Sequence, residues 1–101
     1  MNESLARSQT DLLRSEATRA RAEVSELILV NRAEIAKHNA EHRYDSERSQ
    51  RERAILAAER RAIDLEQMAT NAEDALARMV TRQQSRRKGR KSSVAAAGVN
   101  Q

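Results

Sequence analysis

Residues 55–79 read ILAAERRAIDLEQMATNAEDALARM, and this stretch decides the fold. Within it, apolar residues recur at alternating intervals of three and four, at Ile55, Ala58, Ala62, Leu65, Ala69, Ala72, Leu76 and Met79. A spacing that averages ~3.5 residues places these side chains along one side of an α-helix and predicts a left-handed coiled coil with a partner helix. We therefore expect residues 54–81 to form a heptad coiled-coil segment.

The seam formed by these eight positions is thin. Four of them are alanine and a fifth is Met79. A buried alanine contributes far less than the ~2–3 kcal/mol expected of a large aliphatic side chain. Small residues permit close approach but hold a two-stranded rod weakly. We therefore expect the helix to bundle with copies of its own chain, or to lie in a larger protein assembly.

The first third of the chain shows a different apolar spacing. Leu13, Val24 and Ile35 recur every eleven residues, and Ala17, Ala20, Ile28 and Asn31 lie on the same face. An 11-residue period averages ~3.67 residues per turn, which predicts a helix that runs straight or slightly right-handed. Residues 1–36 are thus expected to pack along this first-half seam in a different manner from the second half.

Residues 37–53 are almost wholly polar and form a connector between the two patterns. Ser49 followed by Glu52 has the spacing of a capping box, which would begin a second helix and place the turn of an antiparallel hairpin near residues 45–49. The connector has no glycine, proline or Asn-Gly pair, so it carries no strong turn chemistry. We favour one long helix, continuous or gently kinked, and keep the hairpin as the alternative.

The composition supports an all-α protein and argues against a compact globular one. Charged residues make up 34% of the chain and aromatic residues 1%, with no cysteine and no proline. Long helices and coiled coils have this bias, and a core without aromatic residues gains little burial energy. No signal peptide and no apolar run of ~18 residues is visible, so we expect no membrane partner.

The residues His38, Glu41 and His42 match the H-x-x-E-H spacing of inverted zinc peptidases. On a helix, two histidines four residues apart share a face and would chelate zinc. Catalytic zinc also needs a third protein ligand and a dry cleft, which this composition does not offer. We therefore favour two solvent-facing or interfacial histidines, and predict no enzyme activity, no metal or other cofactor, and no small-molecule substrate.

Positive charge is concentrated at the carboxyl end. Residues 1–81 carry 13 basic and 15 acidic side chains, whereas residues 82–101 carry six basic ones and no acid: Arg82, Arg86, Arg87, Lys88, Arg90 and Lys91. Such a cluster neutralises phosphates and predicts salt-sensitive, sequence-independent binding to DNA or another acidic surface. The plainer alternative is a solubilising end. We expect residues 82–101 to form a basic, partly extended tail.

The ending Arg87-Lys88-Gly89-Arg90-Lys91-Ser92-Ser93-Val94 is similar to the Lys-Gly-Arg-x-Ser-type tails of small helical virion proteins of tailed bacteriophages. Those proteins lie at the portal, inside the head, or are ejected with the genome. The resemblance implies a helical structural role and portal, capsid or tail proteins as partners. Members are longer and often carry an apolar N-terminal segment, which this chain lacks, so membrane-channel formation is not expected.

These observations together predict a non-enzymatic structural or assembly protein. In a phage it would be a minor virion component packed as several helices in or on a portal or head–tail assembly, with the basic tail contacting DNA or an acidic protein surface. The alternative is a coiled-coil adaptor or nucleic-acid-associated protein. The expected location is the virion in the first case and the cytoplasm in the second.

Overall fold

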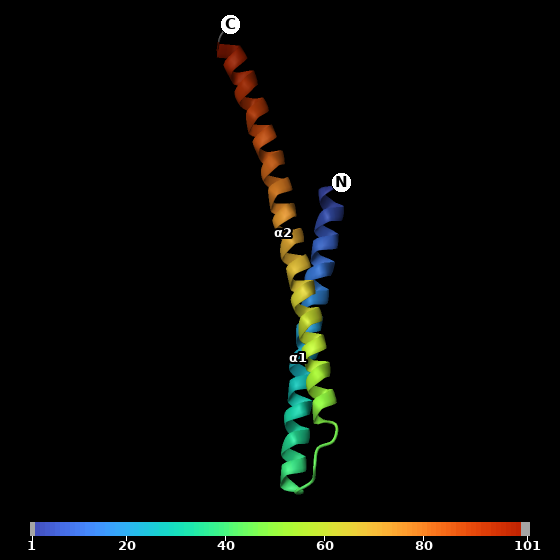
Figure 1. Ribbon diagram of the computed structural model, residues 1–101. Helices are drawn as coiled ribbons and strands as arrows, with labels where there is room; N and C mark the ends of the chain where they lie inside the picture. The colour runs from blue at the N-terminus through green and yellow to red at the C-terminus, as the bar shows by residue number, and fades with distance from the viewer. Residues whose placement is uncertain (1, 100–101) are drawn as a thin grey trace.

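The computed structural model describes the backbone of residues 2–99 and the side chains of residues 2–86. It contains two helices, α1 (Glu3–Ala40) and α2 (Arg48–Val99), and the described residues form no strand. The helices run antiparallel, side by side, in a molecule of 91 × 20 × 15 Å (Figure 1). The predicted all-helical, elongated class is confirmed, and of the two architectures that the sequence left open, the structure has the hairpin.

At the turn of the hairpin, α1 ends in a Schellman motif at a residue that is not glycine. The amide of His42 donates to the carbonyl oxygen of Asn39 at 3.2 Å, and that of Arg43 donates to the carbonyl oxygen of His38 at 2.9 Å. This geometry needs a left-handed residue, and His42 takes it with a φ of 54°. Glycine is the usual residue here, which explains why the sequence carried no visible turn signal.

The connector spans residues 41–47, a few residues earlier than the predicted turn at 45–49. At the start of α2, the amide of Arg48 donates to the carbonyl oxygen of Asp45 at 3.4 Å. Ser49 already lies inside the helix, so the expected Ser49–Glu52 capping box does not begin it. Glu52 instead accepts a hydrogen bond from Nε of Arg48 at 2.9 Å, a pairing within the first turn of α2.

The buried side of α1 repeats every seven residues, not every eleven as predicted. Its buried residues are Ala6, Thr10, Ala17, Ala20, Val24 and Asn31, of which four form an unbroken seven-residue series from 10 to 31. The prediction placed Ala17, Val24 and Asn31 on this face but did not include Thr10, and it assigned the face a period of eleven residues. Of the four residues predicted for the first-half seam, Val24 is buried and the other three are half-buried: Leu13, Ile28 and Ile35.

The core is small and made chiefly of alanine. Ala20 and Val24 of α1 pack with Ala58 and Ala62 of α2, and Leu27, Ile28 and Leu65 pack against this cluster. All eight predicted seam positions of residues 55–79 are buried or half-buried, with Ala62 and Ala69 at 0% exposure. The sequence led us to expect this seam to contact other chains. In the structure, α1 of the same chain lies against it at Ala58, Ala62 and Leu65.

α2 continues well past the beginning of α1 (Figure 1). The expectation of an extended chain from residue 82 is therefore wrong for the backbone through Val99, which is helical. No proline interrupts this stretch, and a single internal glycine costs a helix only about 1 kcal/mol relative to alanine. Over the described residues, neither helix combines length with enough apolar character to cross a membrane.

Candidate functional site

Two ion pairs join the helices along one edge of the hairpin. Arg14 holds Glu73 with two hydrogen bonds, from Nε at 2.9 Å and from Nη2 at 2.6 Å. Arg21 holds Glu66 in the same two-pronged way, with Nε at 3.1 Å. The partners are seven residues apart on each helix, so the pairs form successive steps of one ladder. We call this side of the hairpin the ladder edge.

The ladder changes the titration of its carboxylates. The hydrogen bond from Arg21 lowers the pKa of Glu66, and partial burial opposes this effect. The hydrogen bond from Arg14 lowers the pKa of Glu73 in the same way. Both carboxylates therefore remain charged at neutral pH, and both pairs hold the two helices in one register.

A second polar network fastens the connector to the seam. Arg51 of α2 donates from Nε to Oδ1 of Asn31 at 2.9 Å, and from Nη2 to Oδ2 of Asp45. Nδ1 of His38 lies 3.8 Å from the same Asp45 oxygen. The hydrogen bond from Arg51 lowers the pKa of Asp45, against the opposing effect of burial. Because Asn31 is buried in the seam, its bond to Arg51 specifies one alignment of the helices.

The structure separates the histidines of the H-x-x-E-H sequence. His38 lies in the last turn of α1, and its Nδ1 is 2.7 Å from the carbonyl oxygen of Glu34. His42 lies in the connector, beyond the end of the helix, and is exposed. The shared helical face that zinc binding would require is therefore absent. Among the residues that the structure describes, no three His, Cys, Asp or Glu side chains are placed to hold a metal ion together.

The basic end of the molecule begins earlier than the sequence reading placed it. Arg78, Arg82 and Arg86 follow one another every four residues along one side of α2. With Ala75, Met79 and Gln83 they line a shallow hollow of about 330 Å³ that contains no carboxylate. Arg78 was missed because an extended tail was expected to start at residue 82; helical spacing shows that it belongs with the others.

Four further members of the predicted polyanion site lie where only the backbone is described, namely Arg87, Lys88, Arg90 and Lys91. The helix continues through all of them. Beyond Asp74 the chain carries seven basic residues and no acidic one. We call this part of α2, from residue 75 onward, the basic end.

The register of the ladder shows how far the basic end projects. Arg14 lies level with Glu73, and the helices are antiparallel, so Glu3, eleven residues earlier, lies level with residue 84. Residues 85–99 therefore extend past the start of α1 by roughly 22 Å, at ~1.5 Å per residue. Along this projection α2 does not have α1 beside it.

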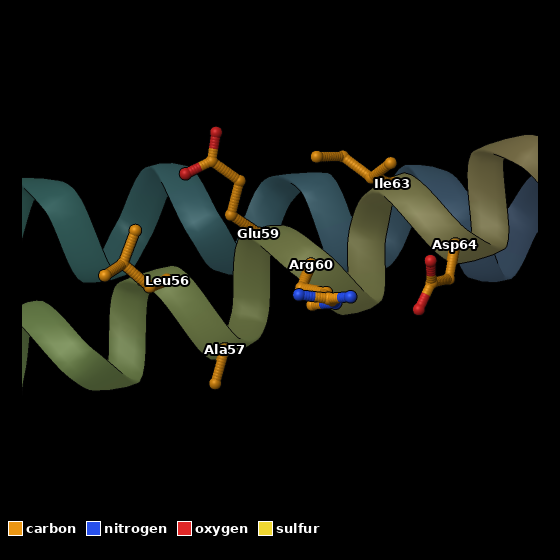
Figure 2. Close-up of a pocket in the computed structure, with 6 residues that line it drawn as sticks. All are labelled: Leu56, Ala57, Glu59, Arg60, Ile63 and Asp64. Carbon is orange, nitrogen blue, oxygen red and sulfur yellow. The ribbon is translucent and has the colours of Figure 1, made fainter.

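The outer surface of α2 bears a second feature, a groove of about 640 Å³ near the connector. Figure 2 shows Leu56, Glu59 and Ile63 along one edge of α2, with Ala57 and Asp64 along the other. Leu56 and Ile63 are 65% and 50% exposed, although both are large aliphatic residues. Alanine thus makes up most of the buried core, whereas these two large aliphatic side chains lie outside it.

No family model, curated protein or solved structure matches the chain.

Proposed function

We propose that this chain is a non-enzymatic structural protein, in which the hairpin is a stiff support that presents a basic helix to a polyanion. One observation carries the proposal: α2 extends past the start of α1, and its projecting part belongs to a stretch that has seven basic residues and no acidic residue. Clustered cations on a rigid helix attract a phosphate backbone without reading its sequence. No aromatic residue accompanies them, so base stacking plays no part.

The setting that fits this proposal is the virion of a tailed bacteriophage. The similarity of residues 87–94 to the tails of small virion proteins supports it, and portal, capsid or tail proteins would be the neighbours of the hairpin. The packaged genome would be the polyanion, with an acidic protein surface as the other target. The second candidate, a coiled-coil adaptor or nucleic-acid-associated protein in the cytoplasm, uses the same basic end.

A salt series of duplex DNA binding tests the role of the basic end. Each phosphate neutralised contributes about 0.9 to the slope of log affinity against log salt. Deletion of residues 82–101, which removes six basic side chains, should lower that slope by up to about five. Replacement of the three described arginines, Arg78, Arg82 and Arg86, by glutamine should lower it by up to about three.

The matched control replaces three exposed arginines elsewhere, Arg19, Arg43 and Arg53, by glutamine. This control removes the same charge from the chain but leaves the basic end intact, so its salt slope should stay close to that of the unaltered protein. Equal loss in the two triple variants would show that only net charge matters. That result, or unchanged binding after the deletion, would refute the proposed role.

A further inference from the structure

Toward the connector, the arginines of the ladder edge give way to aliphatic side chains. Seven-residue steps from Arg14 and Arg21 lead to Ile28 and Ile35 on α1, and steps from Glu73 and Glu66 lead to Glu59 and Glu52 on α2. The last two glutamates therefore lie level with isoleucines in place of arginines. The ladder stops where the outward aliphatic residues of α2 begin.

Four large aliphatic side chains gather on this part of the edge. They form what we call the connector-side patch: Ile28, Ile35, Leu56 and Ile63. The two on α1 are half-buried and the two on α2 are exposed. Leu56 and Ile63 flank Glu59 at three and four residues, which on a helix places them beside it (Figure 2). The patch therefore spans both helices.

Charged residues lie beside the patch on both helices. Arg32 lies on the outer side of α1, four residues after Ile28, and is exposed. In the register of the ladder it is level with residue 55, between Glu52 and Glu59 of α2. Glu59, Arg60 and Asp64 line the groove of Leu56 and Ile63, so the α2 side carries both signs, and Arg32 and Glu59 are the opposite charges that a self-complementary contact would bring together.

We propose that a second copy of the hairpin covers the connector-side patch. A twofold axis parallel to the long axis of the hairpin sets α1 of each copy over α2 of the other. Ile28 and Ile35 of one chain then meet Leu56 and Ile63 of its partner, and Arg32 of each chain meets Glu59 of the other. The four helices enclose the aliphatic side chains that a single hairpin leaves outside.

This inference deepens the proposed function by naming a partner and its surface. Its consequence for polyanion binding rests on that function. With the axis along the hairpin, both basic ends leave the dimer on the same side. The dimer therefore presents two projecting basic helices to one polyanion, whereas a monomer presents one. Sedimentation measures the dimer without DNA, so its failure is distinguishable from a failure of the basic end.

Sedimentation equilibrium over a wide concentration range tests the contact first through its apolar side chains. The unaltered chain should dimerise, and Leu56→Gln together with Ile63→Gln should weaken dimerisation at least a hundredfold. The matched control is Leu5→Gln with Leu12→Gln, since these leucines have the same spacing and similar exposure, 52% and 60%, but lie away from the patch. The control should dimerise like the unaltered chain, with helicity by circular dichroism equal in both variants.

A charge swap tests the arrangement itself. Arg32→Glu alone and Glu59→Arg alone each create two like-charge contacts per dimer, and each should weaken dimerisation about tenfold, which is ~1.4 kcal/mol. An equal mixture of these two variants should form the mixed dimer in preference to either homodimer, because both of its contacts join opposite charges. The double variant Arg32→Glu, Glu59→Arg should recover the affinity of the unaltered chain.

Several results would overturn the proposal. A monomer at every concentration would show that the patch does not bind a second copy, while leaving the DNA experiment unaffected. Equal weakening by the patch variant and the control would assign the contact to another surface. A mixture without preference for the mixed dimer would exclude the pairing of Arg32 with Glu59.

Discussion

His42 gives the most direct test of the hairpin. Glycine at this position should change the stability in opposite directions in the hairpin and in a continuous helix. Its φ of 54° ends α1 in the left-handed region, and its side chain is exposed. For an L-residue that conformation costs about 1–2 kcal/mol, which glycine avoids. Glycine in turn loses about 0.5–1 kcal/mol through the greater freedom of its unfolded chain. His42→Gly should therefore stabilise the protein by roughly 0.5–1 kcal/mol.

Urea unfolding followed by circular dichroism measures this change. With an m-value of ~1.5 kcal/mol/M, the midpoint should rise by about 0.3–0.7 M and the slope should stay the same. Ala33→Gly is the control, since Ala33 lies far from the ends of α1 and its side chain is exposed. There glycine should destabilise by up to about 1 kcal/mol, because it sits in the interior of a helix. Both variants should be compared at one protein concentration, since dimerisation would shift the midpoint.

A continuous helix through residues 41–47 predicts the opposite result at residue 42. His42 would then be an interior helical residue, and glycine would destabilise it by several tenths of a kcal/mol, as it does any interior helical residue. A midpoint that falls for His42→Gly, alongside that of Ala33→Gly, would refute the left-handed turn and the hairpin built on it.

Two further predictions concern the seam and the ion pairs. Ala62→Leu should destabilise by about 1–3 kcal/mol in urea unfolding, because Ala62 is fully buried where the helices touch, whereas Ala77→Leu on the exposed side of α2 should be nearly neutral. Asp45, Glu66 and Glu73 have pKa values lowered by their arginine partners, so their contribution is present above the unfolded pKa and is lost as pH falls through the folded one. The thermal unfolding midpoint should therefore decrease as the pH is lowered below about 4.5, and Glu73→Gln should make this decrease smaller. A pH profile that the substitution leaves unchanged would contradict the role of the ladder.

Several features of the fold could be read from local spacing. The eight-residue seam from Ile55 to Met79 needs only a heptad count, and all of its members are buried or half-buried in the structure. The helical class follows from composition. By contrast, the seven-residue period of the α1 seam was not recognised, because two of its positions, Thr10 and Asn31, are polar. Their burial depends on what α2 brings against them, such as the guanidinium of Arg51 beside Asn31.

The candidate sites, too, could be predicted from the sequence only in part. The basic end was visible as a cluster of arginine and lysine, but its helical form and the inclusion of Arg78 depended on how far α2 continues. The ladder could not be predicted, because Arg14 and Glu73 are 59 residues apart and only the register of the hairpin brings them together. The connector-side patch likewise depends on the alignment of two distant segments.

The sequence by itself determined that the chain is helical, because alanine, arginine and glutamate fill nearly half of its positions and favour helix without help from distant residues. Whether one rod or two packed helices resulted was decided by tertiary structure. A left-handed His42 costs about 1–2 kcal/mol locally. Only the burial of Val24, Ala62 and the rest of the two seams against each other, which joins distant segments of the chain, outweighs that cost and folds α2 back along α1.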